Sequence, residues 1–79
     1  MLRVVRMNGG FQIDVVIPLN ETTELVIGYM KTSLGDQYVC WFCSYKNDYY
    51  WGKYCDNYYD ALKSLNERLN EYLKPYKAE

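Results

Sequence analysis

The sequence predicts one α+β domain over residues 1–79, in which an antiparallel meander of four strands precedes a helix that packs on one face of the sheet. Two observations predict this ββββα order. Between residues 9 and 55, four apolar or aromatic segments of strand length are separated by turn residues, and the first of them alternates with the period of two that is typical of a strand. Within residues 56–74 the spacing becomes three and four, which is the period of an amphipathic helix. Residues 75–79 form a tail.

Residues 9–19 and 24–31 are the first two predicted strands. In the first, alternation places five apolar side chains on one face: Phe11, Ile13, Val15, Ile17 and Leu19. Pro18 cannot donate to a ladder hydrogen bond, so it belongs at a strand end or at an edge. Gly28, inside the second strand, indicates a bulge or the close approach of another group.

Residues 37–46 and 49–55 are the third and fourth strands, joined by a two-residue hairpin loop at Asn47 and Asp48. This loop fixes a register of opposed pairs: Lys46 with Tyr49, Tyr45 with Tyr50, Cys43 with Gly52, Trp41 with Tyr54, and Cys40 with Cys55. Opposed side chains share a face. One face would therefore carry Val39, Trp41, Cys43, Tyr45, Tyr50, Gly52 and Tyr54. The other would carry Tyr38, Cys40, Phe42, Ser44, Tyr49, Trp51, Lys53 and Cys55.

The helix begins with Asp56 or Asn57 as its cap, and Asp60 lies in the first turn, where the helix dipole favours an anion. Pro75 ends it at about residue 74. Its apolar stripe is expected to consist of Tyr58, Leu62, Leu65, Leu69 and Tyr72 or Leu73. At about 25 Å the helix can lie along the whole sheet.

Residues 1–8 leave two alternatives open. Asn8 and Gly9 are a turn signal, so these residues would form a fifth strand at the sheet edge, in a hairpin with residues 9–19. Otherwise they are a frayed lead. The short edge strand is the preferred interpretation.

The formal net charge is −1, which argues against a strongly basic nucleic-acid binder and against an acidic mimic of DNA. Met1 to Arg3 begin like a signal peptide, but Arg6 interrupts the apolar stretch that should follow. The longest apolar runs are far shorter than the roughly 18 residues that span a membrane. We expect a cytoplasmic protein without membrane contact.

Three cysteines and the absence of histidine limit the chemistry of the chain. Cys40 and Cys43 form a C-x-x-C motif, but on a strand they point to opposite faces and cannot share a metal ion or a disulfide. A structural zinc site needs four Cys or His ligands, and the commonest general base is missing. We expect packing thiols, no catalytic residue, no metal site and no cofactor.

The fourteen residues from 47 to 60 hold five tyrosines and a tryptophan. Such rings can simply pack across strands, but one helix covers only one face of a sheet, and both faces of this hairpin carry rings. An exposed aromatic patch is unusual in a monomer and typical of a binding surface. The predicted partner-binding residues are Trp41, Tyr45, Asp48, Tyr50, Trp51, Lys53 and Tyr54.

The aromatic residues and the cysteines together lead to three candidate functions. The first is a non-enzymatic module whose aromatic sheet face binds a protein partner or a second copy of the chain. The second is a single-stranded nucleic-acid binder that uses the same rings for stacking. The third, ranked last, is a small enzyme or redox protein that uses the cysteines.

The stretches GGFQIDVVIPL, TTELVIGYM, YVCW and DYYWGKY followed by DALKSLNERL resemble a group of small accessory proteins. Integrative and conjugative elements and prophages of Firmicutes encode them. The resemblance runs from about Gly9 to Leu73, and its most specific part is residues 48–52 followed by Tyr54. It implies a setting, in which small proteins bind a host or defence protein, including as anti-CRISPR inhibitors, and it implies no mechanism. Residues 1–8 fall outside it.

Overall fold

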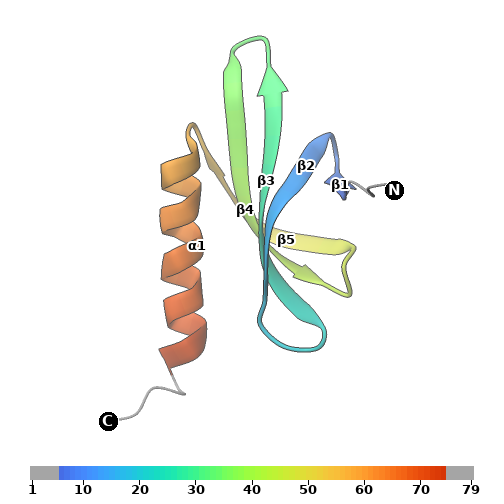
Figure 1. Cartoon of the computed structure of the whole chain (residues 1–79), viewed down its shortest axis with the longest axis vertical. Coiled ribbons are helices and arrows are strands. Elements are labelled where there is room, and N and C mark those ends of the chain that lie inside the picture. Colours follow the sequence, from blue (N-terminus) through green and yellow to red (C-terminus); the bar gives the residue numbers. More distant parts are fainter. Residues whose placement is uncertain (1–5, 75–79) are drawn as a thin grey trace, which may run out of the picture.

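The computed structural model describes residues 6–74, which form a five-stranded antiparallel sheet followed by one helix (Figure 1). The elements are β1 (Met7–Asn8), β2 (Phe11–Pro18), β3 (Thr23–Thr32), β4 (Gly35–Ser44), β5 (Asp48–Cys55) and α1 (Tyr58–Leu73). Strands adjacent in sequence are adjacent in the sheet. The predicted α+β meander is confirmed, β1 is its short edge strand, and Pro18 ends β2. Residues 1–5 of the predicted lead and residues 75–79 of the predicted tail lie outside the described range.

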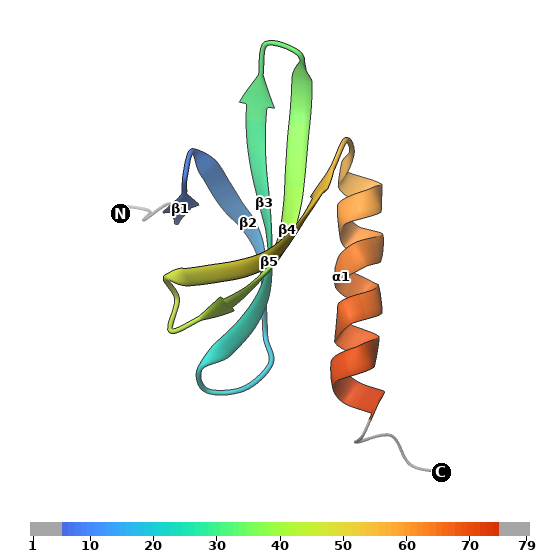
Figure 2. The same cartoon turned by 180° about the vertical axis from the view of Figure 1, so that it is seen from behind.

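Helix α1 lies alone on one side of the sheet, as Figures 1 and 2 both show. Asn57 is its N-cap, and the side-chain oxygen of Asn57 accepts a hydrogen bond from the backbone N–H of Asp60 at 2.9 Å. Of the predicted apolar stripe, Leu65 is buried and Leu69 packs against the sheet, but the other buried residues of the helix are Ala61 and Ser64. Both of these side chains are small, and the predicted stripe residue Leu62 is turned outward, with 39% exposure.

The sheet carries an apolar core on each face. The helix-side core consists of Leu25, Ile27, Cys40, Cys55, Ala61 and Leu65. The far-side core consists of Phe11, Ile13, Val26, Val39, Trp41 and Cys43. No described helix covers the far-side core. The sheet itself closes over it: the rings of Phe11 on β2 and Tyr54 on β5 lie 6.1 Å apart, although β3 and β4 separate these strands in the sheet.

A bulge in β2 divides its apolar residues between the two cores. Ile13 pairs with Gly28 and Val15 pairs with Ile27, so Asp14 is an extra residue without a partner on β3. The extra residue turns the rest of the strand over, because side chains alternate between faces at every residue. The prediction that all the alternating residues of β2 share one face is therefore wrong: Phe11 and Ile13 lie on the far side, whereas Val15 and Ile17 pack on the helix side.

The hairpin of β4 and β5 also differs from the predicted register. Its loop is residues 45–47, and Asp48 is the first residue of β5, paired with Ser44. Tyr45 and Lys46 have left-handed backbones, with φ of 53° and 65°. The backbone N–H of Tyr45 donates to the carbonyl of Thr22 at 2.8 Å, which connects the turn to the loop between β2 and β3. The turn therefore begins at residue 45, two residues before the predicted loop.

A second bulge lies in the middle of β5. Cys40 pairs with Lys53 and Phe42 pairs with Tyr50, so two residues of β5, Trp51 and Gly52, oppose the single residue Trp41. All five predicted pairs of this hairpin are wrong: Lys46 with Tyr49, Tyr45 with Tyr50, Cys43 with Gly52, Trp41 with Tyr54, and Cys40 with Cys55. The bulge also separates Tyr50 from Tyr54, so these two rings project from opposite faces of the sheet.

Trp41 lies between two glycines. A Cβ atom added at Gly52 would lie 2.6 Å from Nε1 of Trp41, and one added at Gly28 would lie 2.9 Å from Cζ3 of the same indole. The close approach predicted at Gly28 is thus confirmed, and Trp41 fills the space that the missing side chain of Gly52 leaves. Phe11 and Tyr49 meet the indole edge-on, each with its ring centroid 5.4 Å away.

We expect Gly52→Ala to lower the free energy of unfolding by about 1–3 kcal/mol, because the added methyl group overpacks against a rigid, buried indole. Urea denaturation followed by far-UV circular dichroism measures this. Lys53→Ala, at the next and exposed position, is the control and should change stability by less than about 0.5 kcal/mol. A Gly52→Ala protein as stable as the parent would contradict the assigned position of Trp41.

Candidate functional site

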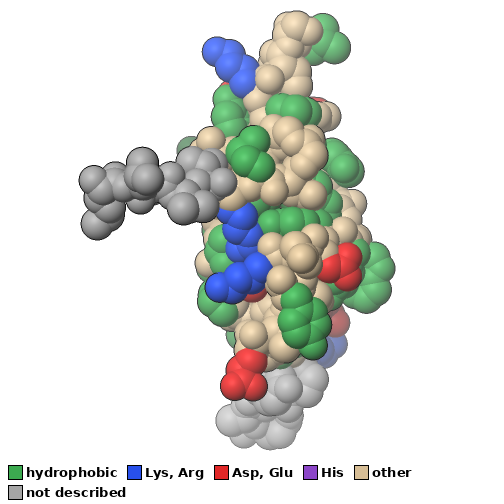
Figure 3. Space-filling view, turned by 90° about the vertical axis from the view of Figure 1, so that its right-hand side faces the viewer, with side chains coloured by type: hydrophobic (Ala, Val, Ile, Leu, Met, Phe, Trp, Pro, Cys, Tyr) green, Lys and Arg blue, Asp and Glu red, His purple; other side chains and the backbone are tan. Residues whose placement is uncertain are grey.

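The seven residues predicted to bind a partner do not form one surface. Trp41 is 7% exposed and belongs to the far-side core. Tyr54 is 60% exposed on the far side of the sheet, where its ring contacts Phe11 and Trp41. Tyr45 is exposed on the hairpin loop. Figure 3 views the molecule from the side opposite α1 and shows hydrophobic side chains there in separate groups among polar atoms.

Two of the predicted residues, Tyr50 and Trp51, meet on the helix side of the sheet together with Phe42. The rings of Phe42 and Tyr50 are nearly parallel with centroids 6.0 Å apart, and the ring of Trp51 meets each of them edge-on, at 5.5 and 5.1 Å. The hydroxyls of Tyr50 and Ser44 are hydrogen-bonded at 3.0 Å. Trp51 remains 71% exposed, with a left-handed backbone at φ 55°.

A groove of about 500 Å³ separates these rings from the C-terminal half of α1. Its lining, which is mostly apolar, comes from Phe42, Trp51, Glu67, Arg68, Glu71 and Tyr72. We refer to it as the Trp51 groove. Arg68 is held against the sheet: its guanidinium donates to the backbone carbonyl of Cys40 at 3.1 Å and lies 5.4 Å from the centre of the Phe42 ring. The hydroxyl of Tyr72 donates to the carbonyl of Leu19 at 3.4 Å.

The carboxylates of the Trp51 groove are exposed. Glu67 and Glu71 lie one helical turn apart on α1, and within residues 6–74 neither forms an ion pair. Arg68 lines the same groove while hydrogen-bonded to the sheet, and its positive charge offsets one of the two carboxylates. The groove therefore combines an exposed indole and other rings with negative charge at its rim.

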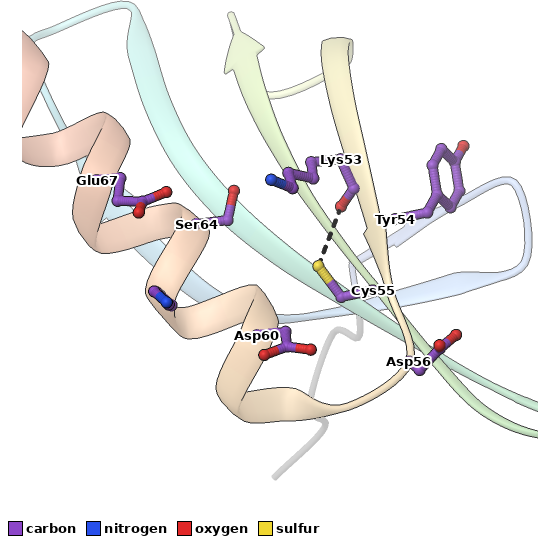
Figure 4. A pocket seen from close by; sticks show the side chains of 8 residues that line it. Lys53, Tyr54, Cys55, Asp56, Asp60, Ser64 and Glu67 are labelled. Atoms are coloured by element: carbon purple, nitrogen blue, oxygen red, sulfur yellow. Dashed lines mark hydrogen bonds between the residues drawn. The ribbon is translucent and has the colours of Figure 1, made fainter.

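A second cleft, of about 350 Å³, lies between the end of β5 and the first half of α1 (Figure 4). Charged side chains of both signs line it, among them Lys53, Asp56 and Asp60, and the thiol of Cys55 is directed toward the backbone carbonyl of Lys53 at 3.8 Å. Asp60 is engaged with the N-cap, since Asn57 donates to its carboxylate at 3.1 Å. In the described part of the chain, no group of three acidic, Cys or His side chains could hold a metal ion.

Arg6 forms a polar cluster that the sequence did not indicate. Its guanidinium donates to Glu24 at 2.7 Å, to the hydroxyl of Tyr49 at 2.9 Å and to the sulfur of Cys43 at 3.1 Å. Burial alone would lower the pKa of Arg6, but the hydrogen bonds to Glu24 and Tyr49 outweigh it and raise the pKa. The partners lie on β3, β4 and β5, so Arg6 closes one end of the far-side core. Their separations of 18 to 43 residues leave no local sequence signal.

The three cysteines are free and buried, with Cys40 in the helix-side core and Cys43 in the far-side core, on opposite faces as predicted. Burial is the main cause that raises the pKa of Cys40 and of Cys55. A thiol that keeps its proton is a weak nucleophile. These two groups are therefore suited to packing.

No protein-family model, no curated protein and no solved structure matches the chain. The resemblance to accessory proteins of mobile elements stays a hypothesis. The helix in the described range is too short and too polar to cross a membrane.

We expect the protein to lose stability as the pH rises above about 9. The thiols ionise near 9.0 in an unfolded chain, whereas Cys40 and Cys55 hold their protons to higher pH in the folded state, so ionisation favours unfolding. Tyr49, whose pKa burial raises above 10.0, acts in the same direction. Urea midpoints at pH 7 and pH 10 measure the loss. The Cys40→Ala, Cys55→Ala double variant should lose less between these pH values, and equal midpoints for the parent would contradict the raised pKa values.

Proposed function

We propose that the chain is a non-enzymatic protein-binding module whose contact surface is the Trp51 groove. The observation that carries this proposal is the state of Trp51, which combines 71% exposure with a left-handed backbone. A bulky residue in this conformation costs about 1–3 kcal/mol, and an exposed indole recovers little of it by burial within its own chain. Tryptophan is also among the residues most enriched at the energetic centre of protein interfaces.

The charge of the groove favours a protein partner over single-stranded nucleic acid. Stacking of bases on Trp51 and Tyr50 would bring the phosphates past Glu67 and Glu71, which repel them. The guanidinium of Arg68, which donates to the carbonyl of Cys40, lines the same groove and offsets one of the two negative charges, so the lining keeps a net charge of −1 from two carboxylates and one guanidinium. The partner is a different protein or a second copy of the chain.

The resemblance to accessory proteins of mobile elements adds a setting to this proposal. In that setting the partner would be a host or defence protein of the cytoplasm, and binding would inhibit it, as anti-CRISPR proteins inhibit their targets. The buried thiols, with their raised pKa values, support a role without catalysis.

We expect Trp51→Ser to weaken partner binding at least about 30-fold, because the substitution removes the main exposed ring of the groove. The control is Tyr59→Ser, which removes a similarly exposed ring from the first turn of α1. Tagged forms of the parent and both variants are used to capture proteins from the native host, and quantitative mass spectrometry compares them. Circular dichroism confirms that each variant keeps its helix.

Four outcomes separate the hypotheses. Host proteins that the parent and Tyr59→Ser retain and Trp51→Ser loses support the proposal. A concentration-dependent dimer, seen by light scattering and lost in Trp51→Ser, identifies a second copy as the partner. Equal capture by all three forms contradicts the proposal, and binding of a labelled oligonucleotide at low salt that depends on Trp51 would favour the nucleic-acid function.

A further inference from the structure

Three features of the Trp51 groove are each unfavourable for an isolated chain. Glu67 and Glu71 are four residues apart, and like charges at this spacing destabilise a helix. Glu71 also lies in the last turn of α1, where the dipole favours cations, and the basic residue nearest to this end is the C-cap, Lys74. Trp51 has a left-handed backbone. Local choices that conflict with stability tend to gather at functional sites, and here they line one groove.

Together these features define the chemistry of an occupant. On the basis of the proposed function, we propose that the Trp51 groove binds a short segment of a partner protein that presents one large apolar side chain flanked by lysine or arginine. The apolar side chain enters between Trp51 and Tyr72 and packs on Phe42. The basic side chains pair with Glu67 and Glu71, whose Cβ atoms lie about 5–6 Å apart at this helical spacing.

The dimensions of the groove fit such a segment. Its volume of about 500 Å³ lies within the range of ligand sites, about 300–1,000 Å³. The lining is mostly apolar, so an apolar group gains most by entering it, and the two carboxylates at the rim supply charge complementarity to lysine or arginine.

The edge of β5 makes recognition by side chains more favourable than recognition by strand addition. β5 lies at the edge of the sheet, but the bulge at Trp51 and Gly52 divides it into residues 48–50 and 53–55. Each run is too short to template a long partner strand, and bulges and charged residues such as Lys53 are devices by which edges resist pairing. A bound segment is therefore held by the groove.

Selection from a displayed library of random twelve-residue peptides against the full chain tests this inference. The expected consensus is one Trp, Phe or Leu with Lys or Arg within four positions. The selected peptide is then synthesised with a fluorescent label, and its Kd is measured by anisotropy. We expect Glu67→Gln and Glu71→Gln each to weaken binding roughly two- to fivefold, and Trp51→Ala to weaken it at least about 30-fold.

The controls match each change in chemistry but lie elsewhere on the surface. Glu21→Gln removes an exposed carboxylate in the loop between β2 and β3, and Tyr59→Ala removes an exposed ring. Both should bind the peptide as the parent does. A neutral or acidic consensus, the absence of any consensus, or a Kd that the Glu67→Gln, Glu71→Gln double variant changes by less than twofold would overturn the inference.

Failure of the inference and failure of the proposed function are distinguishable. If Trp51→Ser loses host proteins while the peptide consensus lacks basic residues, only the chemistry of the occupant is wrong. If Trp51→Ser retains every captured protein, the proposed function itself fails. Residues 75–79 carry Tyr76 beside Lys77, so the chain's own end is the competing occupant. A chain ending at Lys74 that binds the peptide at least threefold more tightly would assign the groove to that end and overturn the assignment to a partner.

Discussion

The contact on which the rest of the structure depends is the packing of Trp41 against Gly28 and Gly52. An indole is large, and on a flat sheet its neighbours on the adjacent strands would have side chains in the same space. Glycine on both flanking strands removes that obstacle and lets the ring lie against the backbone. The ring then becomes the centre around which Phe11, Tyr49 and Tyr54 close. For so short a chain, whose stability margin is small, burial of one tryptophan is a large part of the total.

This packing explains how one helix suffices for a sheet that is apolar on both faces. The sequence predicts many exposed rings on the assumption of a flat sheet of which one face has no cover. In the structure, β2 and β5 approach each other over the far-side core, and Arg6 closes one end through Glu24 and Tyr49. The surplus is therefore smaller than the composition implies. Of the three rings that meet on the helix side of the sheet, those of Phe42, Tyr50 and Trp51, the ring of Trp51 is the exposed one.

The periodicities of the sequence predicted the strands and the helix because each follows from local alternation. They could not predict the bulges, since an extra residue leaves no local mark. Asp14 sits within unbroken alternation, and only pairing with β3 makes it the extra residue. A bulky residue such as tryptophan rarely adopts a left-handed backbone, so the presence of Trp51 argues against a bulge at this position. The buried face of the helix differs from the predicted stripe because the prediction used only the large apolar residues. It did not include the small residues Ala61 and Ser64, which are buried. The Trp51 groove depends on the bulge of β5 and on which face the helix turns to the sheet. Because neither was predicted correctly, the groove could not be predicted from the sequence.

The bulge of β5 joins the core to the proposed contact surface. Of its two residues, Gly52 faces inward and makes room for Trp41, whereas Trp51 projects toward the helix and forms one wall of the groove. Neither can move along the strand without the other, so the position of the exposed indole is fixed by the packing of the buried one. A ring held in this way loses little conformational entropy when a partner covers it, and preorganisation of this kind favours affinity without additional contact area. A strained, exposed tryptophan is thus compatible with a small and marginally stable domain, because the strain resides in the same bulge that lets the sheet enclose its largest core residue.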